Sequence, residues 1–305
     1  MAYTLLKGHF VIRYSDLPRS GPEPDGDTVK FLPDNPDLVF ELPRISGRPP
    51  QINARGISVR LEAIDALETH FQQTHQELEG ANAARDQLLD QLGFRNVVFW
   101  EDLPNKVESA DEDSVPGFVL SNGIDANGRM IGFVYKGSEA ALKSEDDGAT
   151  LTASTGLIDK SMNAKLLAAG QVYPAFYGTL PTRLREHLAK KSNAARKAGK
   201  GVWPRATADP NNLAEITGLE SLEAAVVWPK LFRRLVSYFQ AGNEGLSGFI
   251  PWLRRGSDDK IFRLDTKTNA TLSDVITVDG NGIMMDVWPE DIIVEPAPAA
   301  ERSRL

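Results

Sequence analysis

One short stretch, VRLEAIDALETHF at positions 59–71, places charged side chains where a strand is expected to end. Its first residues alternate as in a strand, so Arg60 lies on one face of that strand. Asp65 stands at the end of the strand, and Glu68 follows three residues later, about one helical turn away. The stretch therefore predicts a charged site at a strand-to-helix junction. The alternative reading is a surface ion pair between Arg60 and Glu68.

A second stretch, Asp25-Gly26-Asp27, puts two carboxylates just before another expected strand. An Asp-Gly sequence is common in plain turns, so this stretch carries little weight by itself. However, Asp27 begins one strand and Asp65 ends another, so the two side chains could meet at one rim of a sheet. Oxygen ligands without histidine or cysteine suit a hard cation, Ca²⁺ or Mg²⁺.

The composition excludes several other kinds of site. Because the 305 residues include no cysteine, the chain can form no disulfide and no thiolate zinc site, and it has no cysteine nucleophile. The 4 histidines lie far apart, which argues against a histidine metal cluster and a Ser-His-Asp triad. Since neither a leader pattern nor a membrane span is seen, we expect a cytoplasmic protein without membrane contact. The net charge of −8 argues against general nucleic-acid affinity but leaves a local site open.

The elements that must position these residues indicate an α+β protein. Apolar periodicity changes between strand and helix along the first two thirds of the chain. The order of strands, a helix, more strands and two helices favours a small barrel as the sheet. Strands are expected at 8–14, 28–32, 37–42, 57–64, 96–102 and 130–136, and helices at 80–94, 162–170 and 182–203.

Residues beyond 205 are expected to form a separate part. The stretch 206–212 lacks apolar periodicity and predicts a linker. Residues 213–296 predict a small α+β accessory domain with an aromatic core, and the other reading of those aromatic residues is a face that binds a protein partner. Its elements are a helix over 219–240 that Pro229 should kink or split, a strand at 261–266, and a hairpin around Asp279-Gly280-Asn281-Gly282. Residues 297–305 predict a disordered tail.

The charged stretches, taken in order, resemble the staphylococcal nuclease (thermonuclease) family over residues of about 8–203. The order of the matches is more specific than any single motif. It comprises Asp-Gly-Asp-Thr-Val at 25–29, Arg-x-x-x-x-Asp-x-x-Glu-Thr at 60–69, Gly128-Arg129 opening an apolar strand, an asparagine-containing helix at 163–170, the aromatic segment 172–177, and a basic helix that closes on Gly201-Val202-Trp203.

This resemblance implies a five-stranded OB-fold barrel with packed helices, acting as a calcium-dependent nuclease that hydrolyses DNA, RNA or both. Asp27 and Asp65 would hold the Ca²⁺, for which Mg²⁺ is the less favoured substitute. Ala66 would add its backbone carbonyl, and Asp25 would act through a water molecule.

The resemblance also assigns roles around the scissile phosphate. Arg60 and Arg129 would grip the phosphate, and Glu68 would position or deprotonate the attacking water. Negative charge grows on the phosphate oxygens during hydrolysis, and arginine stabilises this charge with paired hydrogen bonds that lysine cannot make. Tyrosines expected near the nucleotide are Tyr135, Tyr173 and Tyr177.

Alternatives remain for the function and for the surrounding surface. Nuclease-like barrels also occur as degenerate folds that bind nucleic acids or proteins without cleaving them, but such copies lose the carboxylates and arginines that this chain retains. Loop 43–56, with Arg44, Arg48 and Arg55, and the basic face of helix 182–203 could contact a phosphate backbone or simply be solvated. Because every residue assigned to chemistry precedes Trp203, the sequence predicts that residues 1–209 fold and act alone.

Overall fold

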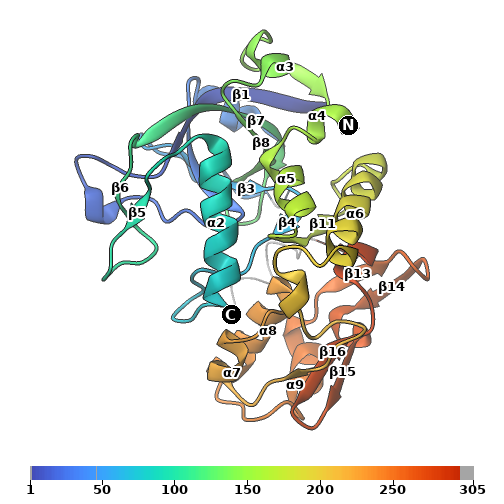
Figure 1. Cartoon of the computed structure of the whole chain (residues 1–305). Coiled ribbons are helices and arrows are strands. Elements are labelled where there is room, and N and C mark those ends of the chain that lie inside the picture. Colours follow the sequence, from blue (N-terminus) through green and yellow to red (C-terminus); the bar gives the residue numbers. More distant parts are fainter. Residues whose placement is uncertain (1, 46, 296–305) are drawn as a thin grey trace. The chain divides into compact units, whose positions relative to one another are not determined.

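The computed structural model describes residues 2–45 and 47–295 (Figure 1). Contacts within the chain divide these residues into two compact units. The first unit holds the described residues up to Glu62 together with Arg85–Leu166. The second unit holds Ala63–Ala84 together with the described residues from Leu167 onward. The predicted tail at 297–305 lies outside the described residues.

A closed five-stranded barrel forms the centre of the first unit. Each strand pairs with the next, β1 pairs with both β2 and β7 to close the ring, and only the β3–β8 pair in this ring is parallel. The fold class is therefore α+β, and the barrel is compatible with an OB-fold. In order around the ring, the strands are β1 (Ala2–Val11), β2 (Thr28–Pro33), β3 (Ile57–Leu61), β8 (Met130–Lys136) and β7 (Ser114–Ile124), with β9 (Thr150–Thr152) added beside the start of β1.

The barrel interior is filled by large apolar side chains from alternate strand positions. The rings of Phe10 and Phe31 lie 5.1 Å apart between centroids, and both are fully buried. Gly117 faces them, and a Cβ atom at this position would come within 2.1 Å of the Phe10 ring. Glycine is therefore required where β7 crosses this part of the core.

Along the sequence, the helices of the first unit come between the barrel strands or after the last of them (Figure 1). Helix α2 (Leu78–Leu92) begins in the second unit and ends in the first, where Gly93 takes a φ of 114°. It confirms the helix expected at 80–94, and α5 (Met162–Ala169) confirms the one expected at 162–170. The short elements of this unit are α1 (Asp37–Glu41), β5 (Val98–Phe99), β6 (Val107–Ser109), α3 (Ala140–Lys143) and α4 (Thr155–Ile158).

Two expectations for this unit are wrong. The strand expected at 37–42 is the helix α1, which Pro36 precedes; the Asn35 side chain accepts a hydrogen bond from the Asp37 N–H at 3.2 Å and so favours a turn here. The strand expected at 96–102 is reduced to β5. Strand β7 was not expected, because its Pro116 and Gly117 are residues typical of turns.

Among the described residues, the second unit is formed by three small sheets and several helices. Two expectations beyond 213 are confirmed: Pro229 is the first residue of α8, so residues 219–240 are divided into α7 and α8, and β15 and β16 form a hairpin that turns over Gly280-Asn281. The strand expected at 261–266 is β13, which ends at Arg263. The elements are β4 (Ile64–Asp65), β10 (Tyr173–Pro174), β11 (Phe176–Tyr177), α6 (Thr182–Lys197), β12 (Ala214–Glu215), α7 (Leu219–Glu223), α8 (Pro229–Gln240), α9 (Phe249–Trp252), β13 (Lys260–Arg263), β14 (Thr268–Thr271), β15 (Ile276–Asp279), β16 (Gly282–Met285) and β17 (Ile292–Val294).

A single hydrophobic cluster joins early and late segments of the second unit. Tyr173 and Trp203 belong to the same buried cluster as Trp228 and Phe232 of the C-terminal part. Ala206 and Ala208, in the stretch expected to be a linker, are also buried in it, at 5% and 2% exposure. The compact units therefore differ from the expected division at 205–213. Isolated alanines give no periodic signal, which is why this stretch resembled a linker.

Within the described part of the chain, no helix combines the length and the apolar character needed to cross a bilayer.

Candidate functional site

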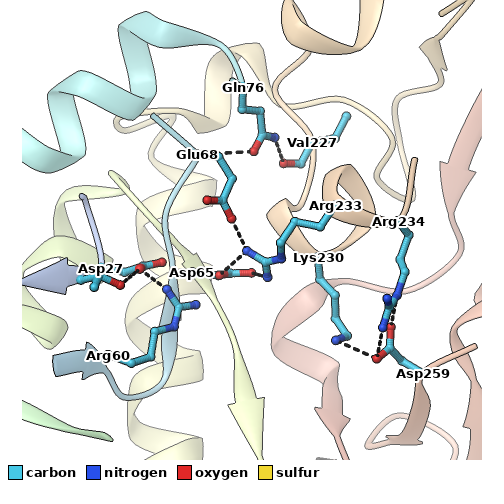
Figure 2. A network of polar contacts seen from close by, with 11 residues as sticks. Asp27, Arg60, Asp65, Glu68, Gln76, Val227, Lys230, Arg233, Arg234 and Asp259 are labelled. Atoms are coloured by element: carbon cyan, nitrogen blue, oxygen red, sulfur yellow. Dashed lines mark hydrogen bonds and ion pairs between the residues drawn. The ribbon is translucent and has the colours of Figure 1, made fainter. Parts of the chain in front are cut away.

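Strands β2 and β3 place Asp27 and Arg60 side by side in the first unit. Thr28 at the start of β2 is in register with Arg60, and the Leu61 N–H donates to the Asp27 carbonyl at 2.8 Å. The Arg60 guanidinium forms an ion pair with the Asp27 carboxylate (Figure 2). The Thr28 hydroxyl donates to the same carboxylate at 2.9 Å. The Asp27 side chain is only 5% exposed, so this pair is set into the barrel wall.

Asp25 belongs to the turn that leads into β2. Its backbone N–H donates to the Thr28 carbonyl at 2.9 Å, and its carboxylate accepts from the Gly26 N–H at 2.7 Å. The turn reading of this stretch is therefore correct. It does not conflict with the placement of Asp27, because the turn is what carries the chain into β2.

Arg129 directly precedes β8 (Met130–Lys136), as the sequence pattern predicts. Gly128 before it adopts a φ of 78°, and the Arg129 side chain folds back so that its Nε donates to Asp125 at 2.9 Å. Strands β3 and β8 are parallel, with Arg60 level with Ile131. Arg129 therefore comes two residues before the position of β8 that pairs with Arg60.

In the second unit, Asp65 and Glu68 are joined by an arginine from α8. Nη2 of Arg233 donates to one oxygen of Asp65 at 2.8 Å, and Nη1 donates to the other at 3.2 Å (Figure 2). Nη1 also bonds to Glu68. Burial disfavours the charge on Arg233, but attraction to Asp65 and Glu68 outweighs burial and holds the pKa of the guanidinium well above its ordinary value.

The position of Glu68 corrects one expectation. It was expected in the first turn of a helix, but the chain is irregular from Ala66 until α2 begins at Leu78. Leu67 is completely buried, and Gln76 binds the segment: its N–H donates to the Glu68 carbonyl at 2.8 Å, and its side chain donates to the Val227 carbonyl at 2.6 Å. An extended path that buries Leu67 therefore replaces the helical turn.

Sequence reasoning missed Arg233. The signal available was the basic face of α8, where Lys230, Arg233 and Arg234 alternate with apolar residues. Two of these cations bind Asp259, Lys230 at 2.9 Å and Arg234 at 2.8 Å. Burial alone would raise the pKa of Asp259, but the two cations outweigh it and lower this pKa to about 2. The helix thus uses its basic residues as internal counter-ions rather than as a solvated face.

The tyrosines expected near a nucleotide are mostly buried. Tyr135 is fully buried in the barrel, and this burial raises the pKa of its hydroxyl. Tyr173 is 3% exposed, and its ring lies 4.8 Å from that of Trp203. Neither offers surface to a substrate in this conformation, because aromatic residues on these strands serve as core. Tyr177, in β11, is half-buried.

The two basic segments make internal contacts. Arg55 in loop 43–56 lies over the ring of Tyr14 at 4.5 Å and pairs with Asp16 at 2.6 Å. On α6, Arg196 lies 3.5 Å from the ring centroid of Trp288 and pairs with a buried glutamate. These two arginines therefore have structural partners within their own units.

The fit of the site to a divalent cation can be judged from these contacts. The donor chemistry is suitable, since Asp27 and Asp65 are carboxylates and Ala66 follows Asp65 with a carbonyl. However, both oxygens of Asp65 accept hydrogen bonds from Arg233, and Asp27 is paired with Arg60. No group of three or more potential metal ligands is found among the described residues. As they stand, these residues do not fit a divalent ion.

A buried carboxyl group lies close to Arg60 in the sequence. Glu62 is 5% exposed, and it accepts a hydrogen bond from the Asn122 side chain at 2.8 Å. Burial raises the pKa of Glu62 to about 7, although Asn122 and Tyr3 partly oppose this rise. Burial is also the main cause of the raised pKa of the Tyr3 and Tyr135 hydroxyls, and the charge of Glu62 adds to the rise in both.

A scan against models of known protein families finds no match, and neither does a search of curated proteins.

Proposed function

We propose that the chain is a nuclease that hydrolyses phosphodiester bonds in DNA, RNA or both. The observation that supports this proposal is the placement of two arginines. Arg60 lies beside Asp27 near the end of β3, and Arg129 directly precedes the neighbouring strand β8, two residues before the partner of Arg60. The resemblance to the staphylococcal nuclease family assigns both arginines to the phosphate.

In this proposal, Arg60 and Arg129 bind the scissile phosphate and stabilise the charge that develops on its oxygens. To bind the phosphate, each guanidinium must give up some of its polar contacts with Asp27 or Asp125. The phosphate can replace them because it is also an anion. Glu68 is the carboxylate that orients the attacking water or takes its proton. The resemblance also implies Ca²⁺. Because the residues do not fit a divalent ion as they stand, no step of the proposal depends on one.

A second candidate is a module that binds nucleic acid without cleaving it. The observation that favours it is the ion pair between Glu68 and Arg233. A carboxylate held by a guanidinium favours its charged form and is a weaker base. A site with that pair intact would therefore bind a phosphodiester and leave it uncut.

One experiment separates the two candidates. The full chain is incubated with labelled single-stranded DNA, double-stranded DNA and RNA, in Ca²⁺, in Mg²⁺ and in chelator, while binding is followed by fluorescence anisotropy. Glu68→Gln is compared with Glu244→Gln, a change at an exposed position. Cleavage that is lost only in Glu68→Gln supports the nuclease. Binding without cleavage under every condition contradicts the nuclease and supports the binding module.

A further inference from the structure

We propose that Arg233 is the resident counter-ion of Asp65 and Glu68 and that it excludes a divalent cation from them. The guanidinium stands where a metal would have to bind the Asp65 carboxylate. The chain as folded therefore does not take up Ca²⁺ at this position. The inference rests on contacts within the second unit and does not require that the protein cleave anything.

The contact between Arg233 and the two carboxylates consists of several hydrogen bonds from one guanidinium. Arg233 forms a two-pronged pair with Asp65, and the same guanidinium bridges to Glu68. The side chains of Asp65 and Glu68 are 2% and 14% exposed, so water competes little for their oxygens. Charge-assisted hydrogen bonds of this paired kind are among the strongest in proteins.

The helix that carries Arg233 is held firmly in its unit. Leu231, Phe232 and Leu235 of α8 are fully buried in the hydrophobic cluster. The adjacent Arg234 is fixed by Asp259, which is itself nearly buried. Arg233 is therefore carried by a helix that is packed into the core and not by a loop.

The charges explain the exclusion. Arg233 carries one positive charge against the two negative charges of Asp65 and Glu68. A divalent ion bound to Asp65 would lie next to the guanidinium, and like charges at such short separations repel strongly in a poorly hydrated site. It would also have to displace the hydrogen bonds to both oxygens of Asp65. Metal and guanidinium therefore compete for the same atoms.

Calorimetric titration of the full chain with CaCl₂ tests this inference directly. The wild type should give no saturable heat at millimolar Ca²⁺. Arg233→Met removes the charge while keeping an apolar side chain of similar length, and it should gain Ca²⁺ affinity by roughly tenfold or more. Adding Asp65→Asn to Arg233→Met should abolish the gain. Arg183→Met, at an exposed position of α6, is the matched control and should behave like the wild type.

Saturable Ca²⁺ binding by the wild type that Asp65→Asn removes would overturn the inference, and this arm needs no variant of Arg233. An Arg233→Met protein that folds, as judged by circular dichroism, and binds no Ca²⁺ would also overturn it. Should that variant be unfolded, Arg233→Lys supplies the test. It keeps the charge and loses the paired geometry, so it should bind Ca²⁺ more tightly than the wild type, and unchanged affinity would count against the proposal.

Discussion

Arg60 is the residue on which the proposed chemistry depends most directly, because it is the arginine that lies beside Asp27 in the barrel wall. Its guanidinium has donors in a planar arrangement that can serve Asp27 and a phosphate at the same time. A lysine at the same place would keep the charge and lose this arrangement. The role of Arg60 can therefore be separated from that of a positive charge.

We expect Arg60→Lys to reduce cleavage by about 10²-fold or more while changing thermal stability little. The measurement is the initial rate on a labelled oligonucleotide, paired with a melting curve for each variant. Arg95→Lys, at an exposed position after α2, is the control and should cut at the wild-type rate. If Arg60→Lys cuts as fast as the wild type, Arg60 does not hold the phosphate.

Glu62 should make the stability of the protein depend on pH. Burial raises its pKa in the folded protein from 4.5 to about 7. The folded state then binds the proton more tightly than the unfolded state does. The free energy of unfolding should fall as the pH rises from about 4.5 to 7 and stay level above that, with a total change of about 3 kcal/mol.

Denaturant unfolding at several pH values between 4 and 8 measures this effect. Glu62→Gln should remove most of the dependence and should be more stable than the wild type at pH 8, because a neutral amide carries no buried charge. Glu112→Gln, at an exposed position, should leave the dependence unchanged. A wild-type protein with constant stability across this range would contradict the assignment.

At the scale of elements, one asparagine joins α5 to the barrel strands. The carbonyl oxygen of the Asn163 side chain accepts from the Val134 N–H at 3.0 Å, and its amide donates to the carbonyls of Glu62 at 2.8 Å and Gly132 at 3.1 Å. Asn163 is completely buried. Its side chain therefore provides hydrogen-bond partners for buried backbone groups at the end of β3 and within β8.

Asn163→Ala should lower the free energy of unfolding by roughly 2–4 kcal/mol, because it leaves buried backbone groups without partners. Chemical denaturation gives this value directly. Asn163→Asp should also destabilise, since a carboxylate cannot donate to the two carbonyls. Asn127→Ala, in the exposed turn before Gly128, provides the comparison. A loss below about 1 kcal/mol for Asn163→Ala would mean that water replaces the amide at little cost.

Sequence reasoning succeeded where a signal is local. Pro229 marks the start of α8 because proline is favoured in the first helical turn, and the Gly280-Asn281 turn sets the hairpin β15–β16. The helix after Asp65 was predicted wrongly, because burial of Leu67 and the contacts of Gln76 depend on distant segments. Helix α1 was missed because the start signal at Asn35 was outweighed by the alternating pattern that follows it.

The residues of the candidate site were also predictable only where a local sequence motif places them. Asp27 and Arg60 come from two local motifs at strand ends, and the register of β2 and β3 brings them together. The bond between Arg233 and Glu68 joins positions 165 residues apart, and no short pattern encodes it. The sequence pattern likewise could not predict the burial of Tyr135 and Tyr173, since an aromatic residue on a strand can lie in a core or on a surface.

At the scale of the whole molecule, the second unit draws its core from both ends of its sequence. Leu67 and Trp203 lie in the same buried cluster as Phe232 and Val294. We therefore no longer expect residues 1–209 to fold as a complete and active fragment. Removing residues 210–305 would remove most members of this buried cluster and leave Tyr173 and Trp203 with fewer apolar neighbours.

We expect the fragment 1–209 to be insoluble or to lack cooperative unfolding in its second unit. The measurements are solubility after expression, the emission maximum of its tryptophans compared with the full chain, and digestion by a protease at low concentration. The full chain, with its core complete, is the control. A soluble fragment that melts cooperatively and protects Trp203 from solvent would show that the late segments are an addition to an independent core.

The division of the chain between the units also has a consequence for its synthesis on the ribosome. Within the described residues, the chain passes from one unit to the other at Glu62–Ala63, Ala84–Arg85 and Leu166–Leu167. All five barrel strands have therefore emerged once Leu166 is made. Segment 63–84, which carries Asp65 and Glu68, pairs its strand β4 with β10 soon afterwards, but Arg233 does not exist until α8 is made. Because domains generally fold as units during synthesis, all five barrel strands are present in the nascent chain well before Arg233 can reach Asp65 and Glu68.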